Sequence, residues 1–554
     1  MSSQAAARRA DLIAGVTTAV LLVPQAMAYA LLAGLPPQVG LYAASVPLLV
    51  YAALGSSPRL AIGPVALDSL MLAAAVTPLA RATGASYLGL ALLLTCMVGA
   101  LQVLLGLGRL GFVANFLSRP VLSGFTSAAA LLIASSQLGP LTGLSLPSGR
   151  FDEILVALPQ RLDALHGPTL AFGLPALLGS LWLSTRFKRF PSALFLVVLG
   201  TLAAAAFHAD RHGVALVGSV PAGLPHFASP LAELGSPWAA LANWRALAPA
   251  AASIALISFV ESLSVGRRLA GPADVDPNRE LVAVGAANFA SGWFGGYVVA
   301  GGLSRSALHA RAGAQSRFAG VVTALVVALT LAFFTPLFRY LPKAVLAALV
   351  LNAVVSLIDV AHARRLWVVQ RSEFWLLLIT FAATLALGAQ LGLGFGVASS
   401  LVLFLVRTTR PHVAILGRLP DTESYRNINR FPEAERSADP LILRVDAQFY
   451  FGNVTFLKRS LDRLCRERPG LRTIILDASG INQLDSSALD ALIEIDRALQ
   501  QQKLRLLFAE VKGPVRDVLE RSGWLAHLQS EQRIFLRVHD AVLSLGTHGE
   551  SGCP

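Results

Sequence analysis

The sequence predicts an α-helical polytopic membrane protein that carries a small cytoplasmic α/β domain at its C-terminal end. Of the 554 residues, 55% are hydrophobic and only 14% are charged. Apolar windows long enough to cross a bilayer recur up to residue 407, and short alternating strands and amphipathic helices follow residue 438. We therefore expect a transmembrane domain over 1–407, a polar, proline-bearing linker over 408–437, a soluble domain over 438–546 and a tail over 547–554.

The transmembrane domain contains about 14 apolar segments in two sets of seven. They lie near 11–33, 39–54, 64–79, 86–107, 119–138, 168–184 and 191–208, and near 248–266, 281–293, 303–312, 317–335, 343–358, 372–387 and 389–406. An odd number of crossings per half inverts the second half relative to the first, so we expect inverted repeats over about 11–208 and 248–406. The sequence leaves open whether the long loops 139–167 and 209–247 contain helices.

The net charge of +13 comes mostly from Lys and Arg placed between apolar segments, such as Arg8-Arg9 and Arg364-Arg365. This bias is typical of the cytoplasmic side of a membrane protein and not of a nucleic-acid surface. It predicts cytoplasmic N- and C-termini, and we expect the cell inner (plasma) membrane as the location. The three scattered cysteines predict neither a disulfide framework nor a metal site. Nothing resembles a nucleotide-binding loop or a catalytic triad, so we expect no enzyme, no cofactor and no nucleic-acid partner.

Two short interruptions, at 63–69 and 300–306, stand at comparable places in the two halves. Each follows an extended apolar lead-in and opens into a short helical stretch. A helix that begins inside the membrane directs unpaired N–H groups and a positive dipole end at a cavity, which favours an anion. We expect the contacting backbone groups to belong to Val65, Ala66 and Leu67 and to Leu303 and Ser304. The Ser304 hydroxyl is a further donor. Arg305 is a fixed cation, and the alternative is that it only joins helices through backbone carbonyls.

Two acidic residues lie within apolar segments. Glu261 is central in an otherwise uncharged stretch over 250–266, where a carboxylate is expected to carry a proton. The alternative is a permanent ion pair with Arg305. Sodium is less favoured, because its site needs several oxygen ligands and the residue one turn later is Val265. Asp68 lies in the first turn after the first interruption, either as a second protonatable group or as a helix cap.

The soluble domain is expected to form one sheet covered by helices. The predicted strands are Leu441–Val445, Thr473–Asp477 and Leu504–Phe508, and the predicted helices are Asn453–Arg466, Ser487–Gln502 and Pro514–Ser522.

The order of motifs resembles the SulP anion transporters, also called solute carrier family 26, over nearly the whole chain. The motifs are Pro24-Gln25-Ala26-Met27-Ala28-Tyr29-Ala30, Gly63-Pro64-Val65-Ala66, Ser258-Phe259-Val260-Glu261-Ser262 and Ser304-Arg305-Ser306-Ala307, followed by a tail similar to a STAS domain with Leu484-Asp485-Ser486-Ser487-Ala488-Leu489. The resemblance implies a homodimer in which a core domain moves against a gate domain and the substrate is held between the third and tenth helices.

The resemblance also implies roles for single residues. Gln25 and Tyr29 share one face of the first helix and would face the substrate, although hydrogen bonding between helices would explain them as well. Glu261 matches a position associated with proton coupling. Gly302 replaces a serine, which widens the pocket, and Asp68 stands where the family is apolar. Ser487 matches a serine that STAS domains of the anti-sigma-antagonist type phosphorylate, although a simple helix cap is the favoured interpretation here.

Together these features predict a secondary active transporter of a small anion: sulfate, bicarbonate or a dicarboxylate. Proton-coupled symport by an elevator-like movement is the favoured mechanism. The alternatives are sodium-coupled symport, an uncoupled anion exchanger or channel, and a signalling scaffold in which the STAS domain recruits a cytoplasmic partner.

Overall fold

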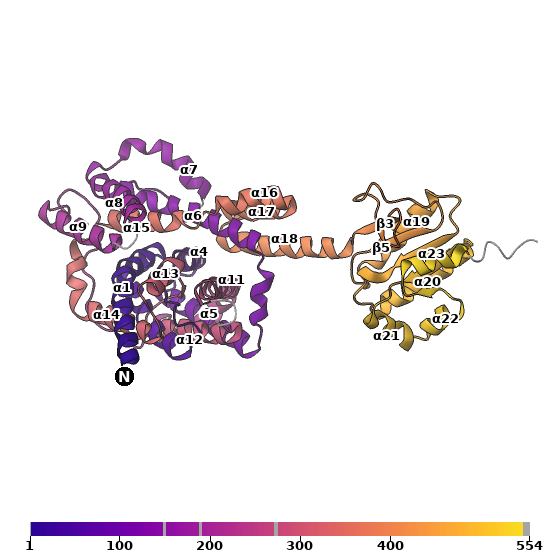
Figure 1. The fold of residues 1–554 in the computed structure, drawn as a ribbon. Coiled ribbons are helices and arrows are strands. Elements are labelled where there is room, and N and C mark those ends of the chain that lie inside the picture. Colours follow the sequence, from indigo (N-terminus) through magenta and orange to yellow (C-terminus); the bar gives the residue numbers. More distant parts are fainter. Residues whose placement is uncertain (1, 148–150, 188–190, 236, 271–274, 547–554) are drawn as a thin grey trace, which may run out of the picture. The chain divides into compact units, whose positions relative to one another are not determined.

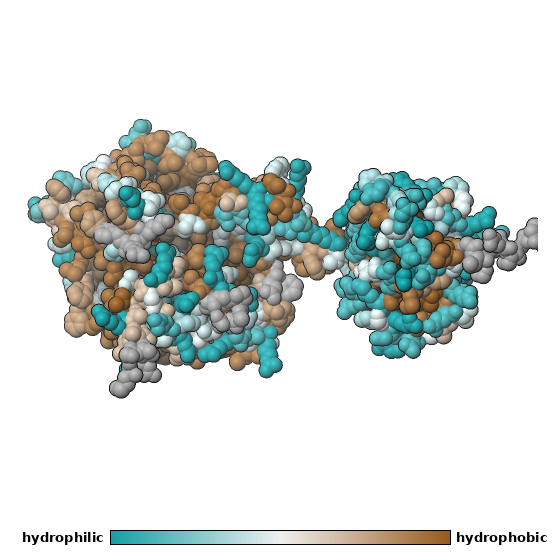
Figure 2. Space-filling view, viewed as in Figure 1, coloured by the Kyte–Doolittle hydropathy of each residue, from teal (hydrophilic) through white to brown (hydrophobic). Residues whose placement is uncertain are grey.

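A computed structural model describes residues 2–147, 151–187, 191–235, 237–270 and 275–546. The chain divides into two compact units, Met1–Ser400 and Leu401–Pro554. The first unit is helical (Figure 1) and exposes large apolar side chains such as those of Leu104, Phe207 and Phe333. Apolar residues cover much of its visible surface in Figure 2, whereas hydrophilic residues predominate on the second unit. An apolar exterior is what a bilayer requires.

The predicted apolar segments all fall on helices. Those of the first half are α1 (Ser2–Leu32), α2 (Pro37–Ala43), α3 (Val46–Leu54), α4 (Ala66–Thr83), α5 (Tyr87–Leu107), α6 (Arg119–Thr142), α8 (Gly167–Arg186) and α9 (Ser192–Ala206). Those of the second half are α11 (Pro237–Ala270), α12 (Pro277–Trp293), α13 (Leu303–Arg311), α14 (Phe318–Leu329), α15 (Lys343–Val355), α17 (Arg371–Leu387) and α18 (Ala389–Thr409). Within the described ranges, nine helical spans are long and apolar enough to cross a membrane, and the count of 14 crossings stays a prediction.

Among the described residues, three further α-helices lie between these segments. α7 (Phe151–Gln160) and α10 (Pro230–Glu233) answer the question that the sequence left open, because each lies in one of the two long loops. α16 (Val360–Val369) is a short helix between α15 and α17.

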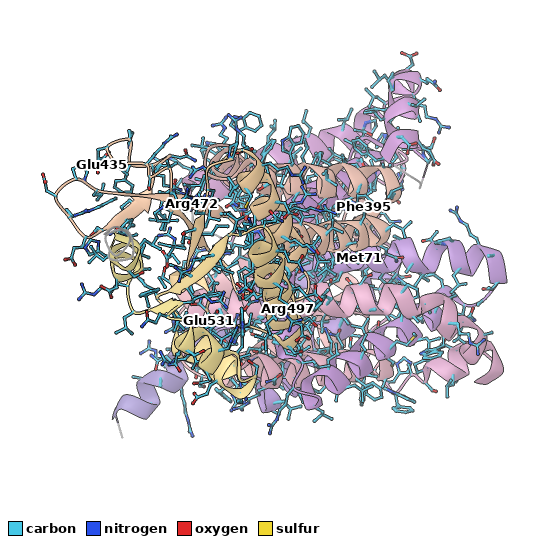
Figure 3. All side chains as sticks on the ribbon, turned by 90° about the vertical axis from the view of Figure 1, so that its right-hand side faces the viewer. Met71, Phe395, Glu435, Arg472, Arg497 and Glu531 are labelled. Carbon is cyan, nitrogen blue, oxygen red and sulfur yellow. The ribbon has the colours of Figure 1, made fainter. Side chains whose placement is uncertain are left out.

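The helices of the first unit pack in two groups. α1 to α5 pack with α11 to α14, and α6, α8 and α9 pack with α15 and α17. Each group thus combines corresponding helices of the two halves, as inverted repeats would. Helix α18 contacts the first group, because its Gln390 donates a hydrogen bond to the carbonyl of Met71 in α4 at 3.3 Å. Figure 3 labels Met71 on α4 and Phe395 on α18, five residues after Gln390.

Glycines allow the closest packing in the first group. A Cβ atom at Gly99 of α5 would lie 2.4 Å from the backbone N of Phe289 in α12, and one at Gly285 of α12 would lie 2.7 Å from the backbone N of Val103. Small residues that let two backbones approach are a common basis of helix association in membranes. This contact holds α5 and α12 together.

The second unit contains a six-stranded sheet with the order β4-β3-β5-β6-β7-β8. The strands are β3 (Val413–Arg418), β4 (Tyr425–Asn427), β5 (Leu441–Val445), β6 (Thr473–Asp477), β7 (Arg505–Ala509) and β8 (Ile534–Phe535), and the helices are α19 (Val454–Arg466), α20 (Ser486–Gln501), α21 (Gly513–Arg521), α22 (Trp524–Ser530) and α23 (Val538–Gly546). Strands β5 to β8 are parallel, and β3 and β4 extend the sheet in antiparallel pairing. In Figure 3, Arg472, Arg497 and Glu531 mark the start of β6, helix α20 and the end of α22.

The structure differs from the predicted linker over 408–437, because β3 and β4 lie within it. Val413 pairs with Val445 and Leu416 with Ile442, so β3 is hydrogen-bonded to a strand about 30 residues later in the chain. These strands are short and are flanked by polar residues and prolines, so local composition resembles a linker. Pairing with a distant strand, which local composition does not record, makes them part of the sheet.

Candidate functional site

The two predicted interruptions meet in space as a short antiparallel ribbon. Strand β1 (Ile62–Gly63) precedes α4 and strand β2 (Ala300–Gly301) precedes α13. Ile62 pairs with Gly301, and Gly63 pairs with Ala300. The ribbon gives both extended lead-ins backbone partners, which unpaired strands at membrane depth would lack. It also brings the starts of α4 and α13 to one place.

Both helices begin without a side-chain cap. The N-cap residues are Val65 for α4 and Gly302 for α13, and neither accepts a hydrogen bond through a side chain. The first intrahelical bonds run from Ser69 N to Val65 O at 3.1 Å and from Ser306 N to Gly302 O at 2.9 Å. The three preceding N–H groups of each helix therefore have no intrahelical acceptor. Two such starts combine N–H donors with positive dipole ends, which is an arrangement suited to an anion.

Arg305 joins the two lead-ins. Its side chain is buried and donates to three backbone carbonyls: Nε to Ala61 at 3.0 Å, and its two terminal nitrogens to Pro64 at 3.1 Å and Ala300 at 3.2 Å. These contacts match the alternative in which the arginine joins helices through carbonyls. They also fix its positive charge at the junction of β1, β2 and the two helix starts.

Two glycines lie against this guanidinium group. A Cβ atom at Gly63 would be 3.3 Å from Arg305 Cζ, and one at Gly302 would be 3.2 Å from an Arg305 terminal nitrogen. Gly63 also has a φ of 158°, which few residues with side chains adopt. Glycine at both positions therefore leaves room for the arginine head group between the two lead-ins.

The two helix starts differ in accessibility. At the start of α4, Val65, Ala66 and Leu67 are buried. At the start of α13, Leu303 is 40% exposed and Ser304 is also exposed. Of the two helix starts, that of α13 is therefore the more exposed in this conformation, and its Ser304 side chain is not buried.

Of the two acidic residues, Asp68 is buried and Glu261 is partly buried, and they interact with each other electrostatically. Both carboxylate oxygens of Asp68 and Oε2 of Glu261 are buried without a hydrogen-bond partner. The charge of Glu261 acts on Asp68, and that of Arg305 acts on Glu261. No ion pair within 4.0 Å joins Glu261 to Arg305 in the described part of the chain. Asp68 does not cap α4, since its side chain accepts none of the helix N–H groups.

On α1, Gln25 is half-buried and Tyr29 is 7% exposed. The charges of Arg305 and Glu261 both act on Tyr29, so this side chain lies in the same electrostatic neighbourhood. Among the described residues neither side chain forms a hydrogen bond to another helix. The alternative of helix–helix hydrogen bonding is thus not seen for either residue.

Sequence reasoning missed a set of polar side chains that hold the ribbon and the helix starts. Ser262, one residue after Glu261, accepts from Gly301 N at 2.8 Å, and Ser306 accepts from Ala61 N at 3.0 Å. The side-chain oxygen of Asn288 accepts from Val299 N at 2.8 Å, and the side-chain nitrogen of Asn288 donates to Val299 O at 3.1 Å. An amide within the apolar segment 281–293 was a usable signal, because a buried amide needs partners.

Tyr297 was also missed. It is completely buried, its hydroxyl is 3.1 Å from Ser69 Oγ on α4, and its carbonyl accepts from Ser291 Oγ at 2.7 Å. Tyr297 stands in the lead-in to β2, so it connects the second interruption to the first turn of α4. Its place in an extended lead-in gave no periodic pattern from which this contact could be predicted.

In the second unit, Ser487 is exposed at the second residue of α20. The cap of this helix is the preceding Asp485, whose Oδ1 accepts from Ala488 N at 2.7 Å and whose Oδ2 accepts from Phe451 N at 3.0 Å. Asp485 and not Ser487 is therefore the cap of α20, and the Ser487 side chain is exposed.

Comparisons with known proteins agree with this architecture. Residues 9–380 match the Sulfate permease family, and residues 431–541 match the STAS domain. The chain is 37% identical to "Sulfate transporter 4.1, chloroplastic" of Arabidopsis thaliana, over 96% of this chain and 79% of that protein. It is 36% identical to a probable sulfate transporter of Mycobacterium tuberculosis (strain ATCC 25618 / H37Rv), over 96% of this chain and 94% of that protein.

Solved structures show the same fold. The murine Solute Carrier 26 family member A9 anion transporter, in the inward-facing state, superposes with a TM-score of 0.88 at 25% identity, over 97% of this chain and 91% of that one. The transmembrane domain of the cyanobacterium bicarbonate transporter BicA superposes with a TM-score of 0.60 at 24% identity, over 71% of this chain and 97% of that one. The chain belongs to the sulfate permease family of membrane transporters and carries a C-terminal STAS domain.

Proposed function

We propose that this protein is a proton-coupled symporter of a small anion, with sulfate as the first candidate and with bicarbonate and dicarboxylates next. The observation that carries the proposal is the meeting of two uncapped helix starts beside a buried arginine and a partly buried glutamate whose Oε2 lacks a hydrogen-bond partner. The substrate class follows the names of the relatives, which are sulfate transporters.

In this proposal the anion binds at the accessible start of α13. The N–H groups of Leu303 and Ser304 and the Ser304 hydroxyl donate to it, and Arg305 supplies a fixed positive charge. The N–H groups at Val65, Ala66 and Leu67 complete the site from α4 when the anion is enclosed. Gly302 leaves space beside the arginine, and Gln25 and Tyr29 face the site from α1.

Glu261 is the proposed proton carrier. Its Oε2 is buried without a partner, so an ionised carboxylate there lacks the hydrogen bonds that would stabilise its charge. Arg305 acts on Glu261. An anion bound beside Arg305 therefore adds further negative charge close to the Glu261 carboxylate. Protonation of Glu261 removes this repulsion, so proton and anion binding favour each other.

Movement is proposed to occur between the two helix groups. All the site residues on α1, α4, α11 and α13 belong to the first group, so this group can carry the site as one body against the second group. We further propose the plasma membrane as location, cytoplasmic termini, a homodimer and a regulatory role for Ser487. The exposed Ser487 at a helix start supports the last of these, because a phosphate there would be favoured by the helix dipole.

The test is uptake of labelled sulfate, bicarbonate and fumarate into proteoliposomes that contain the purified full-length chain. Each anion is offered with an inward proton gradient, an inward sodium gradient or neither. The proposal predicts accumulation of one anion that is driven only by the proton gradient. Sodium-driven accumulation would show that sodium and not the proton is the coupling ion. Flux that does not depend on either gradient would indicate an exchanger or channel. The variant Glu261→Gln should accumulate at least about tenfold less anion and should keep exchange.

A further inference from the structure

Asp68 is the most unusual residue of the site, because its carboxylate has no hydrogen-bond partner among the residues that the structure describes. It is 0% exposed, and both of its side-chain oxygens are buried without a hydrogen bond. Another buried acid of the same helix group behaves differently. Glu280 is also 0% exposed, but it accepts from the Tyr51 hydroxyl at 2.7 Å and from the Ser56 hydroxyl at 2.5 Å. Partners of this kind stabilise a buried carboxylate, and Asp68 has none.

Among the described residues, no positively charged side chain forms a hydrogen bond or an ion pair with Asp68. Glu261 of α11 is the charged side chain whose field reaches Asp68, and it is negative. Tyr297 lies near as a neutral hydroxyl that is already bonded to Ser69. The field of Arg305 reaches Glu261, Tyr29 and Tyr297. In this closed environment Asp68 is stable as the neutral acid, because an unpaired buried charge costs several kcal/mol.

We propose that Asp68 is a second proton site, and that Asp68 and Glu261 together take up about two protons with each divalent anion. The inference rests on the proposed function and deepens it. Each proton binds from water on the side where the anion enters, one to each carboxylate. Both protons leave to water on the other side after the anion does.

Charge balance explains why both carboxylates must be neutral in the loaded state. The site has one fixed cation, Arg305, and the partial positive charges of two helix starts. If both acids were ionised, a dianion would bring the local negative charge to about four, which one arginine cannot balance. With both acids protonated, only the anion faces Arg305 and the N–H groups. The empty site therefore holds two negative charges on the two carboxylates, and the loaded site holds two negative charges on the dianion.

The stoichiometry can be measured as a null point. Proteoliposomes containing the full-length chain are held at zero membrane potential with potassium and valinomycin, and the inside-to-outside sulfate ratio that stops net flux is found at an inward gradient of one pH unit. Two protons per sulfate hold a ratio of about 100, and one proton holds a ratio of about 10. We expect about 100 for the wild type and about 10 for Asp68→Asn. The matched control Glu280→Gln, which alters a partnered buried acid, should stay near 100.

Membrane potential gives an independent readout. Two protons with sulfate carry no net charge, so the wild-type null point should not move when the potential is changed. The Asp68→Asn null point should move, because one proton with sulfate carries one net negative charge. If Asp68→Asn does not fold, the wild-type ratio and its response to potential still test the two-proton stoichiometry, and the smaller variant Asp68→Ala tests the assignment to Asp68.

Every outcome discriminates. A wild-type ratio near 10 overturns the second proton site and leaves proton coupling through Glu261 intact. A ratio near 100 in both the wild type and Asp68→Asn overturns the assignment to Asp68. A ratio near 1 in the wild type contradicts the proposed function itself.

Discussion

The starts of α4 and α13 are equivalent in topology and different in chemistry. Both follow a strand of the same ribbon and both lack a side-chain cap. The start of α4 is buried and carries Asp68, whereas the start of α13 is accessible and carries Ser304 and Arg305. The difference teaches that one geometric device, a helix that begins inside the membrane, can serve two purposes. We assign the anion mainly to α13, and the protons to Asp68 on α4 together with Glu261.

The largest effect is expected for Arg305→Ala, which removes the charge of the α13 start. It also leaves the carbonyls of Ala61, Pro64 and Ala300 without their donor. A hydrogen bond from a charged group contributes about 1.5–3 kcal/mol, so transport should fall by at least about 100-fold. The measurement is initial sulfate uptake per folded transporter. Arg311→Ala, at an exposed position of the same helix, is the control and should stay within about twofold of wild type.

The next effect concerns the carboxylate side of the comparison. Glu261→Gln removes the titratable group and keeps the shape of the side chain, so proton-driven accumulation of sulfate should fall at least about tenfold while sulfate–sulfate exchange persists. Accumulation is measured at a fixed inward pH gradient, and exchange is measured without one. If Glu261→Gln still accumulates sulfate as the wild type does, the division between the two helix starts is wrong.

A smaller effect is expected for Ser304→Ala. The lost hydroxyl is one donor among several, so the apparent KM for sulfate should rise about tenfold with little change in the maximal rate. Ser306→Ala is the matched control two residues away, because Ser306 is buried and accepts from Ala61 N. That variant should lower the thermal stability and leave KM nearly unchanged. The reverse result would place the anion away from the α13 start.

Gly302→Ser tests the space beside the arginine. A Cβ atom there would lie 3.2 Å from an Arg305 terminal nitrogen and 3.5 Å from Val65 Cγ1, so a small side chain fits after a slight shift. We expect a change in KM of about two- to fivefold and a relative loss of larger dicarboxylates, measured by competition against labelled sulfate. Gly320→Ala, where the added Cβ would meet its nearest atom at 4.0 Å, is the control. Equal changes for small and large anions would contradict a role of Gly302 in size selection.

The smallest effect sharpens the contrast between two aspartates at helix starts. Asp485 caps α20, whereas Asp68 does not cap α4. Asp485→Ala should therefore destabilise the start of α20 by about 1 kcal/mol, and Ser487→Ala should not. Hydrogen exchange of the amides around Phe451 and Ala488 measures this. Unchanged exchange in Asp485→Ala would mean that its two hydrogen bonds do not stabilise this helix start.

Much of this comparison was predictable from sequence, because its signals are local. The apolar segments, the glycine-bearing interruptions and the boundaries of β5 and β6 all follow from hydropathy and residue type within short windows. The candidate roles of Ser304, Arg305 and Glu261 came from polar residues placed in apolar surroundings, which is also a local signal.

The remaining features depend on contacts between distant parts of the chain. β3 pairs with β5 across a polar stretch, and Tyr297 reaches Ser69 across more than 200 residues of sequence. The difference in accessibility between the two helix starts depends on which helices pack over each one. Whether Asp68 caps its helix was left open by the sequence, since a carboxylate in a first turn commonly does. Only the packed structure excludes that role.

The most direct test of the division between the helix starts is sulfate affinity as a function of pH, measured by calorimetry on the purified protein. The wild-type affinity should fall as pH rises, because the buried acids must be protonated for the anion to bind. The Ser304→Ala curve should lie below the wild-type curve and parallel to it. The double variant Asp68→Asn/Glu261→Gln should show an affinity that does not change with pH. A double variant that keeps the wild-type pH dependence would contradict the account, as would a Ser304→Ala curve with an altered slope.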